Sequence, residues 1–512
     1  MAPFTCLISY ILVILRLIVA VTAANPHHSR NALDIVAQLQ KELGPLLSGS
    51  SRIFGPDNSQ WASAMDRWQE LAPPQFQGVV QPGTEDDIAK TVQYLDGKSF
   101  DFLVVNQAHA ITSTVGKFNG IQIDVKSLKD VSISADNRTV KLQAGTYSYE
   151  VTAKLWEHGY ITTTTTCACA GIVGPALGGG FGLAQGLYGL SSDNVVSMNV
   201  VLANGTAITV NENINADLFY GMRGAGHNFG IVTSLELAIH PADWMPTWYY
   251  KGYVFTADHL EALFDELNRF HGNGSTPKLM IANFNGYMII PAISNKTATD
   301  AEKLLAPFNQ LNGISQNVTA PYPQIIEAFG VGMESSLCEK DKVHITSAAG
   351  LQVFNITAQR QMYDLFNQNL ALHPEFGNTV IRMEVYGAEG VRNQDPGKSA
   401  YPHRDDYILT AFDALLNPGS DLQGVTRNWA EQTRQLWNAG QPQRLPTTYV
   451  NYASGSESLS SIYGYEAWRQ EKLLDLKKKY DPYNRFGYYN PIPTTNWPGN
   501  RIPGPGPVSG SG

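Results

Sequence analysis

The sequence predicts an α+β protein whose second half contains an antiparallel sheet, and three observations lead to this prediction. The chain has 512 residues and is 43% hydrophobic, which is enough for two or three domains with complete cores. As far as Pro241, β-rich runs alternate with short helices and glycine-rich turns. Beyond Pro241, strands with helices grouped between them indicate an α+β domain over residues 246–440.

The chain begins with an apolar run from Leu7 to Ala24 that only Arg16 interrupts. The run ends in small residues, and an arginine near the centre of a membrane span is costly. We therefore expect a cleaved signal peptide over 1–24, rather than a retained anchor, and no stable membrane insertion afterwards. Six N-x-S/T sequons favour a secreted or secretory-lumen glycoprotein. The expected glycosylation sites are Asn137, Asn204, Asn273, Asn295, Asn317 and Asn355.

Charge and cysteine content exclude several classes. The formal net charge is −9 and no basic patch is present, so nucleic acid is not an expected partner. Once Cys6 leaves with the signal peptide, Cys167, Cys169 and Cys338 remain, an odd number. We expect that no disulfide framework holds the fold, that Cys167 and Cys169 pair only with strain, and that no metal is bound. At least one thiol then has another role or is simply buried.

In the first half, local signals define the elements in order. Residues 25–72 read as a leader with a short helix around 63–72. Thr84 and Asp87 form an approximate capping box for a helix whose inner face carries Ile88, Val92 and Leu95. Asn204-Gly205, between two β-rich runs, predicts a hairpin. Further strands are expected at 100–107, 120–125, 139–145 and 229–241.

In the second half, an amphipathic pattern predicts a helix within 257–274, followed by strand-like sequence at 278–293. Helices are expected around 298–312, 358–370 and 465–479, and strands within 378–390 and 405–416. Residues 497–512 are rich in Pro, Gly and Ser and are expected to be a disordered tail.

Residues 162–182, TTTTTCACAGIVGPALGGGFG, place two cysteines before six glycines. No Lys-Ser or Lys-Thr follows, which excludes a Walker A loop, and the strand–turn–helix setting of a Rossmann fingerprint is missing. A second small-residue turn, GMRGAGHNFGIVT, begins at Gly221. Two such turns can hold a pyrophosphate by backbone N–H groups. The alternative is a glycine turn that only permits tight packing.

Several motifs occur in one order: VVNQAHA, CACAGIVGPALGGGFG, GLSSDNV, DLFYGMRGAGHNFGIVT, YVNY and YDPYNRF. On these motifs, residues 73–245 resemble the PCMH-type FAD-binding domain of the vanillyl-alcohol oxidase superfamily. With the C-terminal segment they resemble the berberine-bridge-enzyme-like flavoproteins, especially secreted fungal members of secondary metabolism. The resemblance implies a two-lobed FAD-binding domain at 73–245, a substrate domain at 246–440, and a segment at 441–496 that returns to the FAD domain.

The resemblance also implies a covalently held FAD. His109 is the expected partner of the flavin 8α-methyl carbon, although Gln107 and Ala108 replace the two glycines usual before it. Cys167, eleven residues before Gly178, is the expected partner of flavin C6. Their alternatives are a hydrogen-bonded core histidine and a free thiol. The other implied cofactor contacts are Asn106, Gly171, Gly174, Gly178, Gly179, Gly180, Gly182, Ile231 and Val232.

For catalysis, YVNY resembles the family's active-site strand, which makes Tyr449 the leading residue, with Asn451 and Tyr452 beside it. A phenol is a poor base unless its phenolate is stabilised, and ordinary sheet packing is the alternative. Some relatives use a glutamate after a PHR turn. Here Pro402-His403-Arg404 is followed by Phe412 and Asp413, so that glutamate is in doubt.

The expected function is a secreted FAD-dependent oxidase that performs alcohol oxidation, dehydrogenation or oxidative cyclisation of a small natural product. Hydride passes to FAD, and O2 is the expected final acceptor. One alternative is a carbohydrate (oligosaccharide) oxidase, since sugar oxidases share the fold. The other is a secreted binding glycoprotein that has lost the flavin, because fold alone does not settle function.

Overall fold

The computed structural model describes residues 26–498 except 246, 273–279, 286–287, 295–297 and 329. The predicted signal peptide and two of the sequons, Asn273 and Asn295, lie outside the described residues. Within them, no helix combines the length and apolar character that a membrane span requires. Trp497, expected to begin the tail, is buried and donates its indole N–H to Ser460 Oγ at 3.1 Å. The packed chain therefore continues through this residue.

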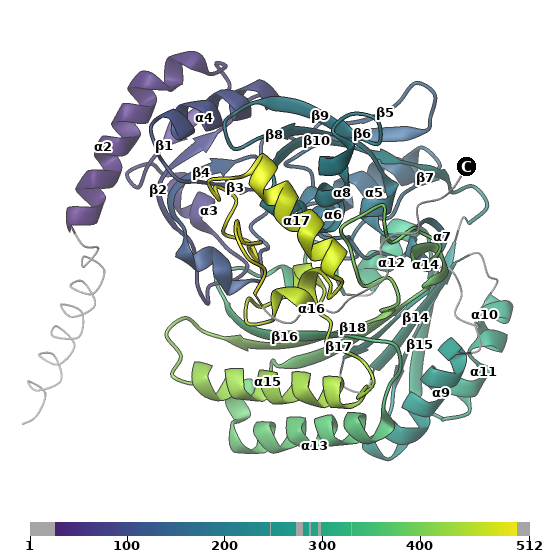
Figure 1. The fold of residues 1–512 in the computed structure, drawn as a ribbon. Helices are drawn as coiled ribbons and strands as arrows, with labels where there is room; N and C mark the ends of the chain where they lie inside the picture. Colours follow the sequence, from purple (N-terminus) through teal and green to yellow (C-terminus); the bar gives the residue numbers. More distant parts are fainter. Residues whose placement is uncertain are drawn as a thin grey trace, which may run out of the picture.

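The N-terminal unit is a four-stranded sheet of order β1-β2-β4-β3 (Figure 1). Strand β4 is parallel to both β2 and β3, and β1 is antiparallel to β2. The segment expected as a leader supplies β1 and a helix, α2, and Leu39 of this helix and Leu43 just after it are fully buried. The elements are α2 Pro26–Glu42, β1 Arg52–Phe54, α3 Trp61–Met65, β2 Gln75–Gln81, α4 Glu85–Gly97, β3 Phe102–Val105 and β4 Asn119–Asp124.

A second, antiparallel sheet of order β5-β6-β10-β8-β9 completes the region predicted to bind FAD, and the two sheets of this region are called the flavin-domain sheets below. A separate two-stranded sheet pairs β7, which lies between β6 and β8 in the chain, with β11, which follows β10. The strands are β5 Val131–Ile133, β6 Thr139–Gln143, β7 Tyr160–Ile161, β8 Val195–Val201, β9 Ala207–Asn211, β10 Ile231–Ala238 and β11 His240–Pro241. The helices are α5 Ser148–Glu157, α6 Val173–Leu177, α7 Gln185–Tyr188 and α8 Ala216–Ala225.

Two local predictions in these sheets are confirmed. Helix α4 begins with the expected capping box: Thr84 Oγ1 accepts from the Asp87 N–H at 3.3 Å, and the Asp87 carboxylate accepts from the Thr84 N–H at 2.9 Å. Gly205, with φ of +83°, turns the chain between the paired strands β8 and β9. Both features arise from residues within four positions of each other, which is why the sequence reveals them.

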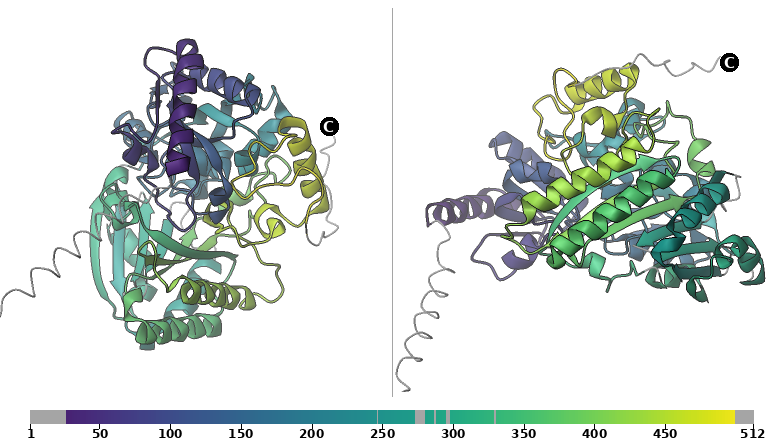
Figure 2. Two further views of the ribbon diagram at one scale, coloured as in Figure 1. Left: turned by 90° about the vertical axis from the view of Figure 1, so that its left-hand side faces the viewer. Right: turned by 90° about the horizontal axis from the view of Figure 1, so that it is seen from below.

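The third unit is a seven-stranded antiparallel sheet of order β15-β12-β14-β13-β17-β18-β16. Helices α13 and α15 cover the face turned away from the flavin-domain sheets (Figures 1 and 2). The strands are β12 Trp248–Val254, β13 Met280–Asn285, β14 Met288–Ser294, β15 Ile314–Ala320, β16 Val343–Leu351, β17 Val380–Tyr386 and β18 Ile408–Leu416. The helices are α9 Leu260–Gly272, α10 Ala298–Leu304, α11 Ala306–Asn309, α12 Tyr322–Ala328, α13 Ile356–Leu372, α14 Glu389–Arg392 and α15 Gln423–Ala439.

The C-terminal segment leaves this sheet and packs on the flavin-domain region through α16 Leu459–Tyr463 and α17 Ala467–Tyr480 (Figure 1). Its anchor is a fully buried ion pair, in which Lys477 Nζ lies 2.6 Å from the carboxylate of Asp481. Lys477 also donates to the Asn228 carbonyl at 3.1 Å, and Asp481 accepts from the Phe486 N–H at 2.9 Å. These extra hydrogen bonds satisfy the two charges, without which their burial is strongly unfavourable.

Candidate active site

A cavity of about 380 Å³ lies between the flavin-domain sheets, the seven-stranded sheet and the C-terminal segment. This volume falls in the usual range for a small-molecule or cofactor site. Of the residues that the sequence assigned to the cofactor, seven line it: Asn106, His109, Cys167, Gly171, Gly174, Ile231 and Val232. The three residues assigned to catalysis, Tyr449, Asn451 and Tyr452, also line it.

His109 meets the cavity at the end of an unusual turn. Ala108 adopts the left-handed conformation, with φ of +59°, although it has replaced the glycine usual at that position. The turn is held from outside: the Trp68 N–H donates to the Ala108 carbonyl at 3.1 Å, and Gln107 donates to the Gly145 carbonyl at 2.8 Å. The substituted turn therefore keeps a glycine-like geometry, and tertiary contacts compensate its strain.

The imidazole of His109 is held in its neutral form. Its ring stacks on Trp68 at 5.6 Å between centroids, and its buried Nε2 has no partner among the described residues. Burial, helped by the charges of Lys340 and His344, lowers the pKa of His109 to about 4. A neutral imidazole with a free nitrogen is the form that acts as a nucleophile.

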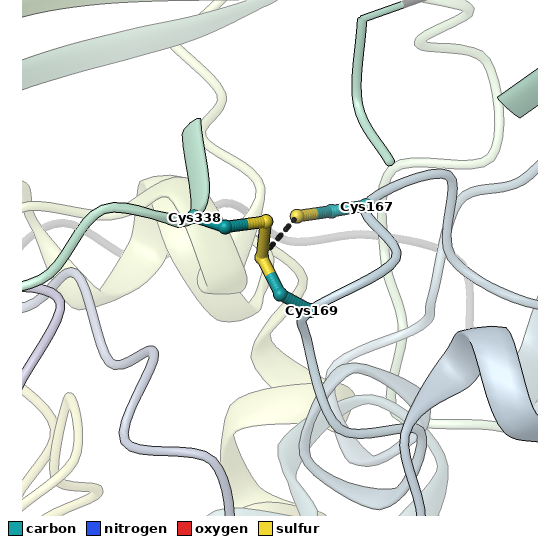
Figure 3. Close-up of side chains that lie close together, drawn as sticks. All are labelled: Cys167, Cys169 and Cys338. Atoms are coloured by element: carbon teal, nitrogen blue, oxygen red, sulfur yellow. Dashed lines mark hydrogen bonds between the residues drawn. A yellow bond between two sulfur atoms is a disulfide. The ribbon is translucent and has the colours of Figure 1, made fainter. Parts of the chain in front are cut away.

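The cysteines correct one expectation. Cys169 and Cys338 form a disulfide that joins the glycine-rich loop to the third unit across 169 residues, and Cys167 is free (Figure 3). An odd number of cysteines rules out only that all of them are paired. One long-range disulfide is therefore present, and it leaves the Cys167 thiol unpaired. Cys167 Sγ lies 3.5 Å from Cys169 Sγ. Burial raises the pKa of the Cys167 thiol above its usual value, and the guanidinium of Arg382 offsets only part of this rise.

The glycines divide into two groups. Gly174 lines the cavity, and a Cβ added to it would meet no atom within 4 Å, so its backbone is open to a ligand. Gly178, Gly179, Gly180 and Gly182, also expected to contact the cofactor, are instead packed against protein atoms and do not line the cavity. A Cβ on Gly178 would clash with the Asn451 side chain. Gly178 thus lets the 449–452 segment approach closely, while Gly179 and Gly180 make room for Tyr401 and Ser191.

The YVNY segment is not a strand, because Val450–Tyr452 form a 3₁₀ turn. Tyr449 Oη accepts from the Gly180 N–H at 2.9 Å and from Asn451 Nδ2 at 2.7 Å. Burial nevertheless raises the pKa of Tyr449 to about 12, with those two donors acting in the opposite direction. This environment opposes a phenolate base at Tyr449 and favours a neutral phenol that positions neighbouring groups.

Glu384 on β17 is a cavity residue that sequence reasoning missed. Its Oε2 accepts from Tyr386 Oη at 2.8 Å, and Tyr452 Oη lies 3.1 and 3.2 Å from its two oxygens. The missed signal was period-two alternation, because Ile381, Met383 and Val385 enter the helix-covered core and their neighbours face the cavity. Phe412 and Asp413, which follow the PHR turn, lie elsewhere: Phe412 packs on Trp429, and Asp413 lies 2.9 Å from His344 Nδ1.

His227 is a second cavity histidine without a predicted role. It stacks on Tyr489 at 4.2 Å, its buried Nδ1 has no partner among the described residues, and burial lowers its pKa to about 4. Both side-chain polar atoms of Asn106 are likewise buried without a described partner. Buried polar groups normally hydrogen bond. These unpaired polar atoms of His109, His227 and Asn106, with the accessible backbone of Gly174, fit a large polar cofactor such as FAD.

The two-lobed fold and this cavity define an FAD-binding oxidoreductase. A family model described as FAD binding domain matches residues 76–211. The chain is 45% identical over 468 residues to the FAD-linked oxidoreductase anuG of Penicillium roqueforti, covering 89% of this chain and 92% of that one. It is 43% identical over 477 residues to FAD-linked oxidoreductase OXR2 of Pyricularia oryzae, with coverage of 89% and 92%. The protein belongs to the family of these FAD-linked oxidoreductases.

Solved structures agree in fold. A chitooligosaccharide oxidase has a TM-score of 0.77 at 20% identity, covering 91% of this chain and 100% of that one. A glucooligosaccharide oxidase from Acremonium strictum, whose description names a 6-S-cysteinyl, 8α-N1-histidyl FAD, has a TM-score of 0.76 at 20% identity, with coverage of 91% and 99%. At 20% identity, the similarity to these structures shows a shared fold only.

Proposed function

We propose that the protein is a secreted, glycosylated oxidase of a small hydroxylated natural product, with FAD held covalently by His109 and Cys167 and reoxidised by O2. The observation that carries the proposal is the shared cavity. An unpartnered imidazole nitrogen, a free thiol and the Glu384–Tyr452 pair all line it. The relatives' names support FAD-linked oxidation, and the two tethers in the glucooligosaccharide oxidase support the same pair of attachments here.

When bound, FAD supplies the hydride acceptor and passes the electrons on. The chain's own residues handle the proton. A substrate hydroxyl donates to Tyr452 Oη as the Tyr452 proton moves to the Glu384 carboxylate, 3.1 Å away. Burial, with Glu384 adding to it, holds the pKa of Tyr452 well above its usual value, so this relay uses the neutral phenol. The Tyr386 hydroxyl holds the same carboxylate in place through its 2.8 Å bond.

Glycosylation and secretion remain part of the proposal. Asn137, Asn204, Asn317 and Asn355 are all exposed, as sugar attachment requires. At Asn355 the amide oxygen caps α13 by accepting from the Ala358 N–H at 3.0 Å. Attachment through the amide nitrogen is compatible with that cap. Mass spectrometry of the protein secreted by a fungal host, with and without glycosidase, tests these sites together with cleavage near residue 24.

The tethers are tested by acid precipitation of the purified holoenzyme, which strips FAD that is not covalently bound. We expect yellow protein from wild type, from His109→Ala and from Cys167→Ala, and colourless protein from the double variant. His227→Gln is the matched control, because His227 is also a buried, neutral cavity histidine with one unpartnered ring nitrogen. Loss of the histidyl bond in His227→Gln, and its survival in His109→Ala, would reverse the assignment. Protein without flavin would support the binding-glycoprotein alternative.

A carbohydrate oxidase is the second candidate, favoured by the fold shared with oligosaccharide oxidases. A peroxide-coupled screen separates the two candidates. Its first arm is a panel of mono- and oligosaccharides, and its second arm contains benzylic and allylic alcohols and phenolic diols. Peroxide formation confined to the sugar arm would replace the proposal with the carbohydrate oxidase.

A further inference from the structure

The guanidinium of Arg382 is a charged group of the cavity that the proposed reaction does not use. Strand β17 places Arg382 on the same face as Glu384 and Tyr386, two residues before the glutamate. Its strand neighbours Ile381 and Met383 belong to the core under α13 and α15. Arg382 therefore projects into the cavity with its charge next to the proton-accepting pair.

Nothing in the described part of the chain pairs with this guanidinium. Its Nε is buried without a hydrogen-bond partner, and no ion pair joins Arg382 to a carboxylate of the described residues. The nearby carboxylates are already engaged, since Glu384 accepts from two tyrosines and Asp413 binds His344. Arginine does not escape by losing its proton. Burial alone would lower the pKa of Arg382, but electrostatic interactions with Tyr452, Asp413 and Glu384 raise it instead.

An unpaired guanidinium beside a catalytic carboxylate needs an anion. The Arg382 side chain is half-buried, and a planar oxyanion can match its fork of N–H donors. We propose that Arg382 is the subsite for an anionic oxygen group of the substrate, a carboxylate or an ionised phenol, and that it orients the substrate hydroxyl toward Tyr452 and Glu384. The substrate class is then acidic hydroxy compounds rather than neutral sugars. This inference rests on the proposed function.

The rest of the wall suits such a molecule. Tyr386 packs on Phe181 with ring centroids 5.5 Å apart, and both line the cavity, as do Val331 and Leu337. These surfaces can accept the apolar body of an aromatic acid or phenol while Arg382 binds its charged end. A neutral sugar would leave the guanidinium unpaired.

Benzoate is the first probe, added to the aerobic holoenzyme and followed by the change in flavin absorbance. Wild type is expected to bind it, and Arg382→Met to bind it about tenfold more weakly or worse. Arg382→Lys keeps the charge and should fall between them. Benzamide, the uncharged analogue, should bind all three proteins alike. Arg427→Met is the matched control, because Arg427 is exposed on α15 and should change nothing.

A second titration uses 4-cyanophenol above and below its pKa, which separates a phenolate from a carboxylate as the preferred group. Equal benzoate affinity in wild type and Arg382→Met, or no binding to wild type, would overturn the inference. So would a shifted flavin spectrum in ligand-free Arg382→Met, because Arg382 would then contact the cofactor. Wild type that binds benzoate through Arg382 but makes no peroxide would keep the subsite and refute the oxidase. If wild type carries no flavin, calorimetry reports benzoate binding instead.

Discussion

Cys169 is bonded to Cys338, and the free thiol of Cys167 lies 3.5 Å from the Cys169 sulfur (Figure 3). The bond joins the cavity-lining glycine-rich loop to the third unit. Around it, the Ala168 N–H donates to the Val331 carbonyl at 3.0 Å, and Trp68 Nε1 donates to the Leu337 carbonyl at 2.8 Å. The disulfide thus closes one wall of the cavity, and it keeps Cys169 from pairing with the proposed flavin tether.

This arrangement predicts opposite effects for two variants. In a His109→Ala background, only Cys167 can hold FAD covalently. Cys338→Ser leaves the Cys169 thiol free to compete for Cys167 during oxidative folding, so acid-stable flavin should fall. Cys169→Ser with Cys338→Ser removes that competitor, so acid-stable flavin should return. Equal flavin content in the two proteins would contradict the prediction.

The same double variant reports on stability. Loss of a bond that closes a long loop should cost about 2–4 kcal/mol of unfolding free energy. Denaturant titration of the double variant against wild type, both with intact His109, measures this cost. A shift of the same size in Cys167→Ser would instead attribute stability to the free thiol.

Glu384→Gln should slow anaerobic flavin reduction by about 10²–10³-fold, because the proton acceptor of the relay is removed. Tyr452→Phe should slow it as well, while acid-stable flavin is unchanged in both. Stopped-flow absorbance with any substrate that passes the peroxide screen makes the measurement. The control is Glu375→Gln, because Glu375 is an exposed glutamate that does not line the cavity. Wild-type reduction rates in Glu384→Gln would remove Glu384 from the mechanism.

The left-handed Ala108 predicts a graded response to substitution. A non-glycine residue in this conformation costs about 1–2 kcal/mol. Ala108→Gly removes that strain but adds about 0.5–1 kcal/mol of unfolded-chain entropy, so stability should stay near wild type or rise slightly. Ala108→Val should lower both the melting temperature and the histidyl-bound flavin, measured in a Cys167→Ala background. A neutral Ala108→Val would show that the turn tolerates side chains freely.

His227 predicts a loss of stability in mild acid. Its folded pKa is about 4, below the unfolded value of 6.5, so the unfolded state binds a proton first. Its stabilising contribution is complete above pH 6.5 and is lost as the pH falls toward 4. Between pH 6.5 and 5 the loss is about 2 kcal/mol. Urea titrations at pH 7.5 and 5 should show a smaller drop for His227→Phe, which keeps the stack on Tyr489 without a titrating group. Equal drops would contradict this.

Local signals account for the parts of the fold that the sequence predicted well. The Thr84–Asp87 capping box and the Asn204-Gly205 hairpin depend on neighbours in the chain, and both are present. The strand around 378–390 was also predicted, yet its cavity-facing Arg382 and Glu384 were not recognised. Alternation identifies two faces of a strand, but only packing decides which face meets solvent, core or ligand.

By itself, the sequence determined the family, the cofactor class, and the order of the motifs that bring His109, Cys167 and Tyr449 to one place. The tertiary structure decided which groups complete the site. In it, Cys169 is bonded to Cys338 and Cys167 is free. The glycine triplet packs against protein atoms, and Tyr452 donates a hydrogen bond to Glu384. These are contacts between residues far apart in the chain. They form only when the flavin-domain sheets, the seven-stranded sheet and the C-terminal segment pack together, and no local pattern encodes such distances.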